Sequence, residues 1–463
     1  MKSLLGLCIA CAGLLSLSGA AEVTESRPNL IPNPDFKTDE NGKPIGWAFW
    51  SPRPGIAPEA SVVRQQGGNL LKMRAKGFAC YGKWTTVVHN VQPGRSYRFE
   101  ALYKAEKVQK EDVSIAAILS WCKDDSGQQP VQRDYADGVS AANGWRRITR
   151  TLLSPEGAQS VKIELALRWT DQGTVLWKSP ALMEVEPLPH RVIRVVTTHI
   201  KPSYPAIIEN NLKLMSEILD RAGAEKPDIV CLSENFVDRG VRLPITETSQ
   251  SIPGPAIEML CEKAKQYKTY VVTTLHESEG ALIYNTAVLI DRKGEIVGKY
   301  RKVHLATAEG ENGVTPGNEY PVFDTDFSRI GILTCWDNWF VETARILRLK
   351  GAEMLLFPCA GDGVPRHWDV IWRARAIDNG VYFVSSTTVG DAPSRVIDPT
   401  GEVLAETAEQ LGIAVADVDL DREWRVYWLS VGPATGEAKS LYIKERRPDT
   451  YDTFTADVLE RSE

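Results

Sequence analysis

Three side chains that could together transfer an acyl group each stand at the end of a predicted strand in the second half of the chain. Glu234 directly follows an apolar strand, Lys302 closes a strand with a basic cluster, and Cys335 stands where a strand turns into a helix. Reactive groups of α/β folds gather at the carboxyl ends of strands. We therefore expect Glu234, Lys302 and Cys335 to meet at one edge of a sheet.

The chemistry of these groups is complementary. An ordinary thiol has a pKa of about 8.5 and is only a few per cent ionised at pH 7. A helix N-terminus and a nearby cation favour the thiolate, a carboxylate can take the thiol proton, and an ammonium can stabilise an oxyanion. The set predicts acyl transfer through a cysteine thioester.

The elements that must hold these residues alternate between strands and helices. Apolar residues recur at helical spacing in two stretches, and short apolar runs separate them. The predicted elements are a strand at 192–198, a helix at 208–222, a strand at 229–232, a helix at 257–267, a strand at 270–275 and a hairpin of 283–290 with 296–300. This order predicts an α/β layered domain, which we place at residues 190–463.

The region before it has a different pattern. Between residues 29 and 183, short alternating segments are broken by Gly, Pro, Asn and Asp. Such spacing without a helical period predicts an all-β sandwich. The predicted strands are 61–64, 83–88, 97–103, 113–120, 145–152, 161–168 and 173–178. Two prolines in 184–189 predict a linker, so the first domain is expected at 29–185.

The local sequences around the three residues carry a resemblance. Lys302 lies in Tyr-Arg-Lys-x-His-Leu, and Cys335 lies in Gly-Ile-Leu-Thr-Cys-Trp-Asp. From about 191 to 454 the chain resembles the nitrilase, or carbon–nitrogen hydrolase, superfamily. The resemblance implies an αββα sandwich of nitrilase type, with Glu234 as general base, Lys302 as catalytic lysine and Cys335 as nucleophile. It also implies a second acid, for which Glu309 is preferred and Glu311 is the alternative.

This resemblance has further support and two departures. Family-like stretches occur at 321–325, 373–382, 397–402 and 445–449. The usual Phe-Pro-Glu after the nucleophile reads Phe-Val-Glu at 340–342, and Ser233 replaces a common proline before Glu234. Neither change removes a reactive group.

The function expected from this site is that of an amidohydrolase acting on a small linear amide or carbamoyl compound rather than on a peptide bond. The resemblance implies no cofactor and a homo-oligomer. Two alternatives remain: an acyltransferase that uses the same thioester, and a glycan-binding or surface-interaction protein with a weakly active hydrolase domain.

Tryptophans near the nucleophile are candidates for the substrate pocket. Trp336, Trp339 and Trp368 lie close to Cys335 in sequence or on the following helix, with core packing as the alternative. The six histidines show no spacing typical of metal ligands, so we expect no metal site.

The N-terminal region resembles the jelly-roll carbohydrate-binding modules of secreted enzymes. The resemblance rests on Asn29, Asn33 and Phe36, on Gly46-Trp47, and on the stretch 91–97. It implies a possible glycan partner, although its seven tryptophans are equally compatible with a core. Cys80 and Cys122 are its two cysteines, and whether they pair is open.

The chain begins like an exported protein. Lys2 precedes an uncharged apolar run from residue 4 to 17 and then small residues. This pattern predicts a signal peptide at 1–21 and a periplasmic or extracellular protein. No other stretch is long and apolar enough to span a membrane. The net charge of −6 argues against a nucleic-acid partner.

Overall fold

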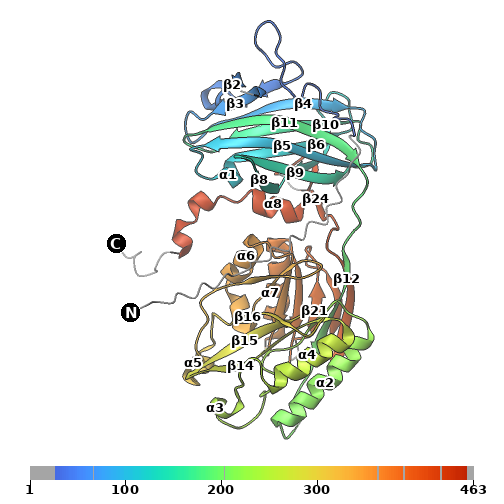
Figure 1. Cartoon of the computed structure of the whole chain (residues 1–463), viewed down its shortest axis with the longest axis vertical. Coiled ribbons are helices and arrows are strands. Elements are labelled where there is room, and N and C mark those ends of the chain that lie inside the picture. The colour runs from blue at the N-terminus through green and yellow to red at the C-terminus, as the bar shows by residue number, and fades with distance from the viewer. Residues whose placement is uncertain are drawn as a thin grey trace, which may run out of the picture.

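The computed structural model describes residues 27–65, 67–202, 204–361, 364–388, 392–427 and 430–455. The predicted signal peptide at 1–21 lies outside the described residues. The chain forms a β-rich part and an α/β part, one above the other in Figure 1.

The β-rich part consists of two antiparallel sheets. One sheet has the order β1-β4-β10-β6-β7, and the other has the order β2-β3-β11-β5-β9-β8. Their strands are β1 (Ala48–Trp50), β2 (Glu59–Gln65), β3 (Gly68–Arg74), β4 (Tyr81–His89), β5 (Ser96–Glu106), β6 (Ile115–Cys122), β7 (Pro130–Tyr135), β8 (Gly138–Ala142), β9 (Trp145–Leu153), β10 (Ser160–Arg168) and β11 (Thr174–Val185).

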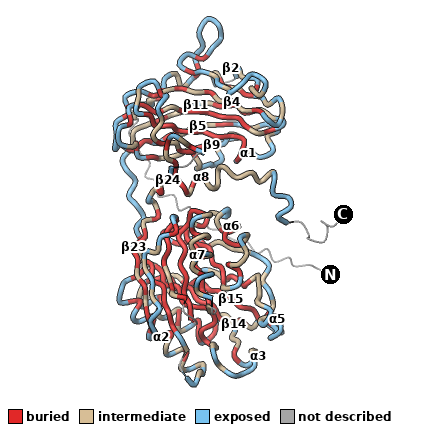
Figure 2. Tube along the Cα trace, turned by 180° about the vertical axis from the view of Figure 1, so that it is seen from behind, coloured by how far each residue is buried: buried red, intermediate tan, exposed pale blue. Residues whose placement is uncertain are grey.

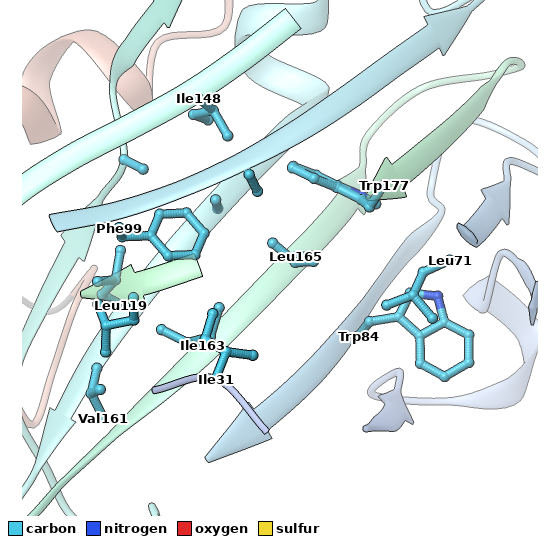
Figure 3. Packing of buried hydrophobic residues seen from close by; sticks show 14 of the residues in the cluster. Ile31, Leu71, Trp84, Phe99, Leu119, Ile148, Val161, Ile163, Leu165 and Trp177 are labelled. Carbon is cyan, nitrogen blue, oxygen red and sulfur yellow. The ribbon is translucent and has the colours of Figure 1, made fainter. Parts of the chain in front are cut away.

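One apolar core joins these two sheets. Alternating residues of β10 face the other sheet, where Phe99 and Trp177 are fully buried. Figure 3 shows Ile163 and Leu165 beneath Phe99 and Trp177. The predicted sandwich is therefore observed as two β-sheets around a common core. A one-turn helix, α1 (Glu111–Ser114), replaces the predicted start of the strand at 113.

The outer face of the first sheet is covered by the C-terminal segment. Two short strands, β24 (Arg425–Tyr427) and β25 (Thr435–Glu437), extend this sheet beyond β7, and the helix α8 (Ala438–Lys444) follows them. Val431 and Leu441 pack on Ile118 and Tyr135. Figures 1 and 2 both place α8 and β24 between the two parts of the molecule. The C-terminal segment thus belongs to both parts.

The α/β part contains two stacked six-stranded sheets, with the orders β16-β15-β14-β13-β12-β23 and β17-β18-β19-β20-β21-β22. The strands are β12 (Val192–His199), β13 (Ile229–Cys231), β14 (Tyr270–Glu279), β15 (Leu282–Ile290), β16 (Ile296–Arg301), β17 (Val322–Asp324), β18 (Arg329–Ile332), β19 (Met354–Pro358), β20 (Tyr382–Ser386), β21 (Ser394–Ile397), β22 (Val403–Thr407) and β23 (Gly412–Asp419).

Helices cover both outer faces of this double sheet. The helices α2 (Ile208–Ala224) and α4 (Pro255–Tyr267) pack on the first sheet, and α6 (Val341–Leu349) and α7 (Pro365–Asn379) pack on the second. The residues between the sheets form a separate core. The order of layers is αββα, as expected, and all the elements predicted between 192 and 300 are present. Figure 2 shows the buried strands inside this part.

The structure answers the open question about Cys80 and Cys122, which are both buried and free. Cys122 pairs with Ser160 at one end of β10, whereas the carbonyl of Cys80 accepts a hydrogen bond from Trp169, just past the other end. A nine-residue strand is roughly 27 Å long, and a disulfide needs Cα atoms within about 7 Å. These two cysteines cannot pair in this fold.

Candidate active site

Strand ends deliver the predicted catalytic residues to one edge of the α/β part. Glu234 follows β13, Lys302 follows β16, and Cys335 follows β18 after two residues. The one-turn helix α5 (Thr307–Glu311) brings Glu309 to the same edge. Figure 1 shows α5 and the short helix α3 (Ile245–Thr248) at this end of the molecule.

A buried hydrogen-bond network connects the charged residues. Lys302 Nζ lies 2.9 Å from Glu234 Oε1 and 2.7 Å from Glu309 Oε2. Asn285 on β15 donates 2.9 Å hydrogen bonds from Nδ2 to Oε1 of each of the same two glutamates. The backbone N–H of Ala360 donates to Glu234 Oε2 at 2.8 Å. Lys302 and Glu234 are almost fully buried, so their charges are held by each other and by fixed dipoles.

The structure distinguishes the two candidates for the second acid. Glu309 contacts Lys302 directly and also accepts a 2.8 Å hydrogen bond from the backbone N–H of Ala306. Glu311 lines the same cavity but is exposed and makes no ion pair in the described part of the chain. The geometry therefore favours Glu309. The sequence missed Asn285, because an asparagine inside an apolar strand carries no motif.

Electrostatic coupling keeps both partners of the central pair ionised. Burial by itself would lower the pKa of Lys302, but the carboxylate of Glu234, the sulfur of Cys335 and the carboxylate of Glu309 together raise this pKa above its ordinary value. Burial by itself would raise the pKa of Glu234, but Lys302 and Arg239 outweigh it and hold that pKa below its ordinary value. The ammonium and the carboxylate therefore persist across the neutral range.

Cys335 sits on a bent piece of backbone. Its φ of 43° lies in the left-handed region. Residues other than glycine rarely adopt this conformation, and those that do are often found at functional sites. It opens a 3₁₀ helix, Cys335–Trp339, and α6 begins only at Val341. The prediction of a strand that turns into a helix at Cys335 is therefore confirmed only in part, because the longer helix starts later.

Asp337 ties this bend to the strand that ends at Lys302. Its fully buried carboxylate accepts hydrogen bonds from the hydroxyl of Tyr300 at 2.6 Å, from the backbone N–H of His304 at 2.9 Å and from the backbone N–H of Thr334 at 3.0 Å. His304 also stacks on Phe340, with ring centroids 3.9 Å apart. Asp337 thus fixes the cysteine loop relative to the lysine strand.

A second cysteine, Cys359, belongs to the site. It follows β19, accepts a hydrogen bond from the backbone N–H of Gly361 at 3.1 Å, and is fully buried. Burial and a hydrogen bond with Cys335 raise the pKa of Cys359 well above its ordinary value. Cys359 therefore remains a neutral thiol beside Cys335. Its position immediately after a strand was the signal that could have identified it.

A cavity of about 740 Å³ opens onto Cys335. Glu234, Lys302 and Glu309 line it together with residues of α3 and the loop before α3, among them Arg239. The Arg239 guanidinium lies 3.9 Å from Glu234 Oε2, and its buried Nε has no hydrogen-bond partner. The cavity can therefore admit a small substrate that carries further polar groups.

The predicted pocket tryptophans lie elsewhere. Trp336, Trp339 and Trp368 are not among the residues that line the cavity. Trp368 is buried and stacks on Trp372, while Trp339 packs against Trp368 with centroids 5.4 Å apart. Trp336 is exposed. The pocket role of these three tryptophans stays a prediction.

The described residues contain no group of three or more His, Cys, Asp or Glu side chains placed to hold a metal ion. No helix in the described part is long and apolar enough to cross a membrane.

Stacked mixed sheets between helix layers, with a cysteine, a lysine and two glutamates at one end, define a class of αββα proteins with a polar active-site cavity. The sequence model of the family Carbon-nitrogen hydrolase matches residues 193–425. The chain belongs to the carbon–nitrogen hydrolase family.

Known proteins are similar to this region. Omega-amidase NIT2 of Homo sapiens is 29% identical over 236 residues, which cover 47% of this chain and 86% of that protein. Omega-amidase NIT2 of Bos taurus is 30% identical over the same length, with the same coverage of both chains. Among solved structures, an amidase from Nesterenkonia sp. aligns with 24% identity and a TM-score of 0.47 over 57% of this chain and 96% of that chain. Saccharomyces cerevisiae Nit3 aligns with 27% identity and a TM-score of 0.45 over 49% of this chain and 90% of that chain.

Proposed function

We propose that this protein hydrolyses a non-peptide C–N bond of a small linear amide or carbamoyl compound through a thioester on Cys335. The observation that carries the proposal is the buried ammonium of Lys302, held between Glu234 and Glu309 in the cavity that contains Cys335. Membership of the carbon–nitrogen hydrolase family and the similarity to omega-amidases support the reaction class.

In the first half of the reaction, Glu234 takes the proton from the Cys335 thiol, and the sulfur attacks the carbonyl carbon of the substrate. The electron pair of the C=O bond moves to oxygen, where Lys302 and nearby backbone N–H groups stabilise the negative charge. The C–N bond then breaks, and Glu234 returns the proton to the leaving amine. The acyl group remains on sulfur.

In the second half, Glu234 takes a proton from water, and the hydroxide oxygen attacks the thioester carbon. The C–S bond breaks as the C=O bond reforms, Glu234 gives its proton to the departing sulfur, and the acid product leaves the restored thiol of Cys335. Glu309 and Asn285 position Lys302 and Glu234 through both steps, because each contacts the charged pair directly.

The decisive experiment is mass spectrometry of the intact protein during turnover. A panel of linear amides, carbamoyl compounds and nitriles is mixed with the enzyme and quenched, and an acyl mass is sought on the peptide containing Cys335. Cys335→Ala should lose both the adduct and turnover while keeping its circular-dichroism spectrum. Turnover by Cys335→Ala contradicts the assignment. Product analysis with added hydroxylamine distinguishes transfer to an amine from hydrolysis.

We also propose that the protein is exported. The N-terminal pattern supports cleavage near residue 21 and a periplasmic or extracellular location. Expression of the full chain with its native N-terminus, followed by fractionation and N-terminal sequencing, tests this. Recovery of the intact N-terminus in the cytoplasmic fraction contradicts it.

The N-terminal region is proposed to be a jelly-roll module of the carbohydrate-binding type spanning 29–185, followed by the hydrolase domain at 190–463. The two-sheet core supports a sandwich architecture. We further propose a homo-oligomer, which sedimentation velocity on the purified chain tests directly.

A further inference from the structure

A second cavity, of about 370 Å³, lies far in sequence from the catalytic residues, on the outer face of the sheet β1-β4-β10-β6-β7. In the strand pairing, Glu164 of β10 lies opposite Ile118 of β6, which lies opposite Tyr135 of β7. Arg168 of β10 lies opposite Tyr81 of β4. Ser430, Val431, Glu445 and Arg447 of the C-terminal segment complete the wall. The cavity therefore exists only where the sandwich and the C-terminal segment meet.

Two guanidinium groups at this cavity have no carboxylate partner. Arg168 is 4% exposed. It donates to the carbonyl of Val113 and to the hydroxyl of Tyr135, each at 3.1 Å, but forms no ion pair in the described part of the chain. Arg133 also lines the cavity, and its buried Nε has no hydrogen-bond partner. A buried cation is costly unless an anion compensates it.

The carboxylate of Glu445 compensates the positive charge of Arg168 only indirectly. This carboxylate accepts a 3.3 Å hydrogen bond from the hydroxyl of Tyr135, which itself accepts from Arg168. The two buried carboxylates at the cavity, Glu164 and Asp134, are paired with Lys83 and Arg425. The forked donors of Arg168 and Arg133 match a planar carboxylate or a sulfate.

Aromatic rings stand beside these charges. Trp169 has a φ of 51°, in the left-handed region, which sets its ring at the end of β10. The guanidinium of Arg168 lies 4.4 Å from the centroid of this ring, and the ring of Tyr81 lies 6.0 Å away. Trp50, largely exposed, extends the row beyond Tyr81. Aromatic faces of this kind pack against the apolar C–H face of a sugar ring, while carboxylates accept from its hydroxyls.

We propose that this cavity binds an acidic saccharide, whose carboxylate or sulfate pairs with Arg168 and Arg133 and whose ring packs on Trp169. Glu164 accepts a hydrogen bond from a sugar hydroxyl. This site is separate from the hydrolase cavity and does not depend on the proposed amide chemistry. Because the C-terminal segment forms one wall, the isolated β-sandwich lacks the complete site, and the full chain is the form to test.

The test is isothermal titration of the full chain with glucuronate, glucose 6-sulfate, glucose and inorganic sulfate. The acidic sugars are expected to bind at least ~10-fold more tightly than glucose or sulfate, a difference of about 1.4 kcal/mol. Equal binding of glucose contradicts the role of the arginines. If inorganic sulfate binds as tightly as the acidic sugars, the cavity holds an adventitious ion only, and the proposal of a sugar site is wrong. The proposal is also wrong if none of the four compounds binds.

Matched variants assign the binding to this cavity. Trp169→Ala and Arg133→Gln should each weaken binding of the acidic sugar by ~10-fold or more. Trp145→Ala, which removes a half-buried tryptophan on β9 of the other sheet, should leave it unchanged. An unchanged circular-dichroism spectrum and urea midpoint in each variant show that the chain is folded. If Trp169→Ala and Arg133→Gln bind as the parent does, the proposal is wrong.

Discussion

Each part of the molecule buries a lysine–glutamate pair, but in different places. In the α/β part, Lys302 and Glu234 lie beyond the ends of their strands. Glu309 contacts Lys302, and Asn285 contacts Glu234. In the sandwich, Lys83 and Glu164 are diagonal neighbours in the middle of paired strands. Charged side chains at strand ends face the cavity beyond the sheet. Charged side chains on a sheet face are instead enclosed by the segment that packs on that face.

The covering element also differs between the two parts. Helices cover the outer faces of the α/β sheets and leave the strand ends accessible. The outer face of one sandwich sheet is instead covered by the C-terminal segment of the same chain, through Val431 and Leu441. Similar ion pairs thus lie at accessible strand ends in one part and on a covered sheet face in the other.

The largest expected effect comes from breaking each pair at its lysine. Lys302→Met should lower kcat/KM by about 10³-fold or more, because the oxyanion loses its cation. Lys83→Met should leave turnover within about twofold and lower the free energy of unfolding by about 2 kcal/mol, since Glu164 stays buried. Steady-state kinetics and urea unfolding measure the two effects. Comparable turnover in the two variants would show that the two pairs are equivalent.

The second prediction separates the two acids of the α5 region. Glu309→Gln should lower kcat by about 10²-fold, because its contact with Lys302 loses its charge. Glu311→Gln, which touches no partner in the described part of the chain, should stay within about twofold of the parent. Initial rates at saturating substrate decide between them. The opposite ranking would make Glu311 the second acid.

The third prediction concerns the junction of the two parts. Arg425 pairs with the buried carboxylate of Asp134, and burial already raises the pKa of that carboxyl. Arg425→Gln should lower the free energy of unfolding by about 3 kcal/mol, because an unpaired buried acid remains. Arg64→Gln, on the exposed side of β2, should change it by less than about 0.5 kcal/mol. Equal urea midpoints for both variants would show that the junction adds no stability.

The smallest expected effect is a pH dependence confined to the α/β part. Burial, together with Lys201, lowers the pKa of His199 to about 4. The unfolded chain, with an ordinary histidine near 6.5, therefore binds more protons below that pH. His199 should reduce stability as pH falls from about 6.5 toward 4, by about 2 kcal/mol at pH 5.

Unfolding of His199→Gln across this pH range measures the contribution. The slope of stability against pH should become flatter than in the parent. His89→Gln, at an exposed position of the sandwich, should keep the parental slope. If the slope of stability against pH is the same in His199→Gln as in the parent, His199 does not cause the pH dependence.

Much of the site could be expected from the sequence because its residues follow apolar strands within recognisable local patterns. Glu234, Lys302 and Cys335 are each adjacent to a strand end, and the structure brings all three to one cavity. Asn285 and Asp337 could not be expected in the same way, since their partners lie on other strands. A pocket role for the tryptophans near Cys335 stays a prediction, because sequence proximity to Cys335 does not fix the side on which a ring lies.

Local pattern by itself predicted a β-rich part, an α/β part and the elements between 192 and 300, and it singled out Glu234, Lys302 and Cys335, because periodicity and strand ends are local properties. Only the tertiary structure decided that Glu309 rather than Glu311 reaches Lys302, that Cys80 and Cys122 lie near opposite ends of β10, and that β24, β25 and α8 lie against one sheet of the sandwich. These outcomes depend on contacts between segments far apart in the chain, and no local pattern encodes such distances.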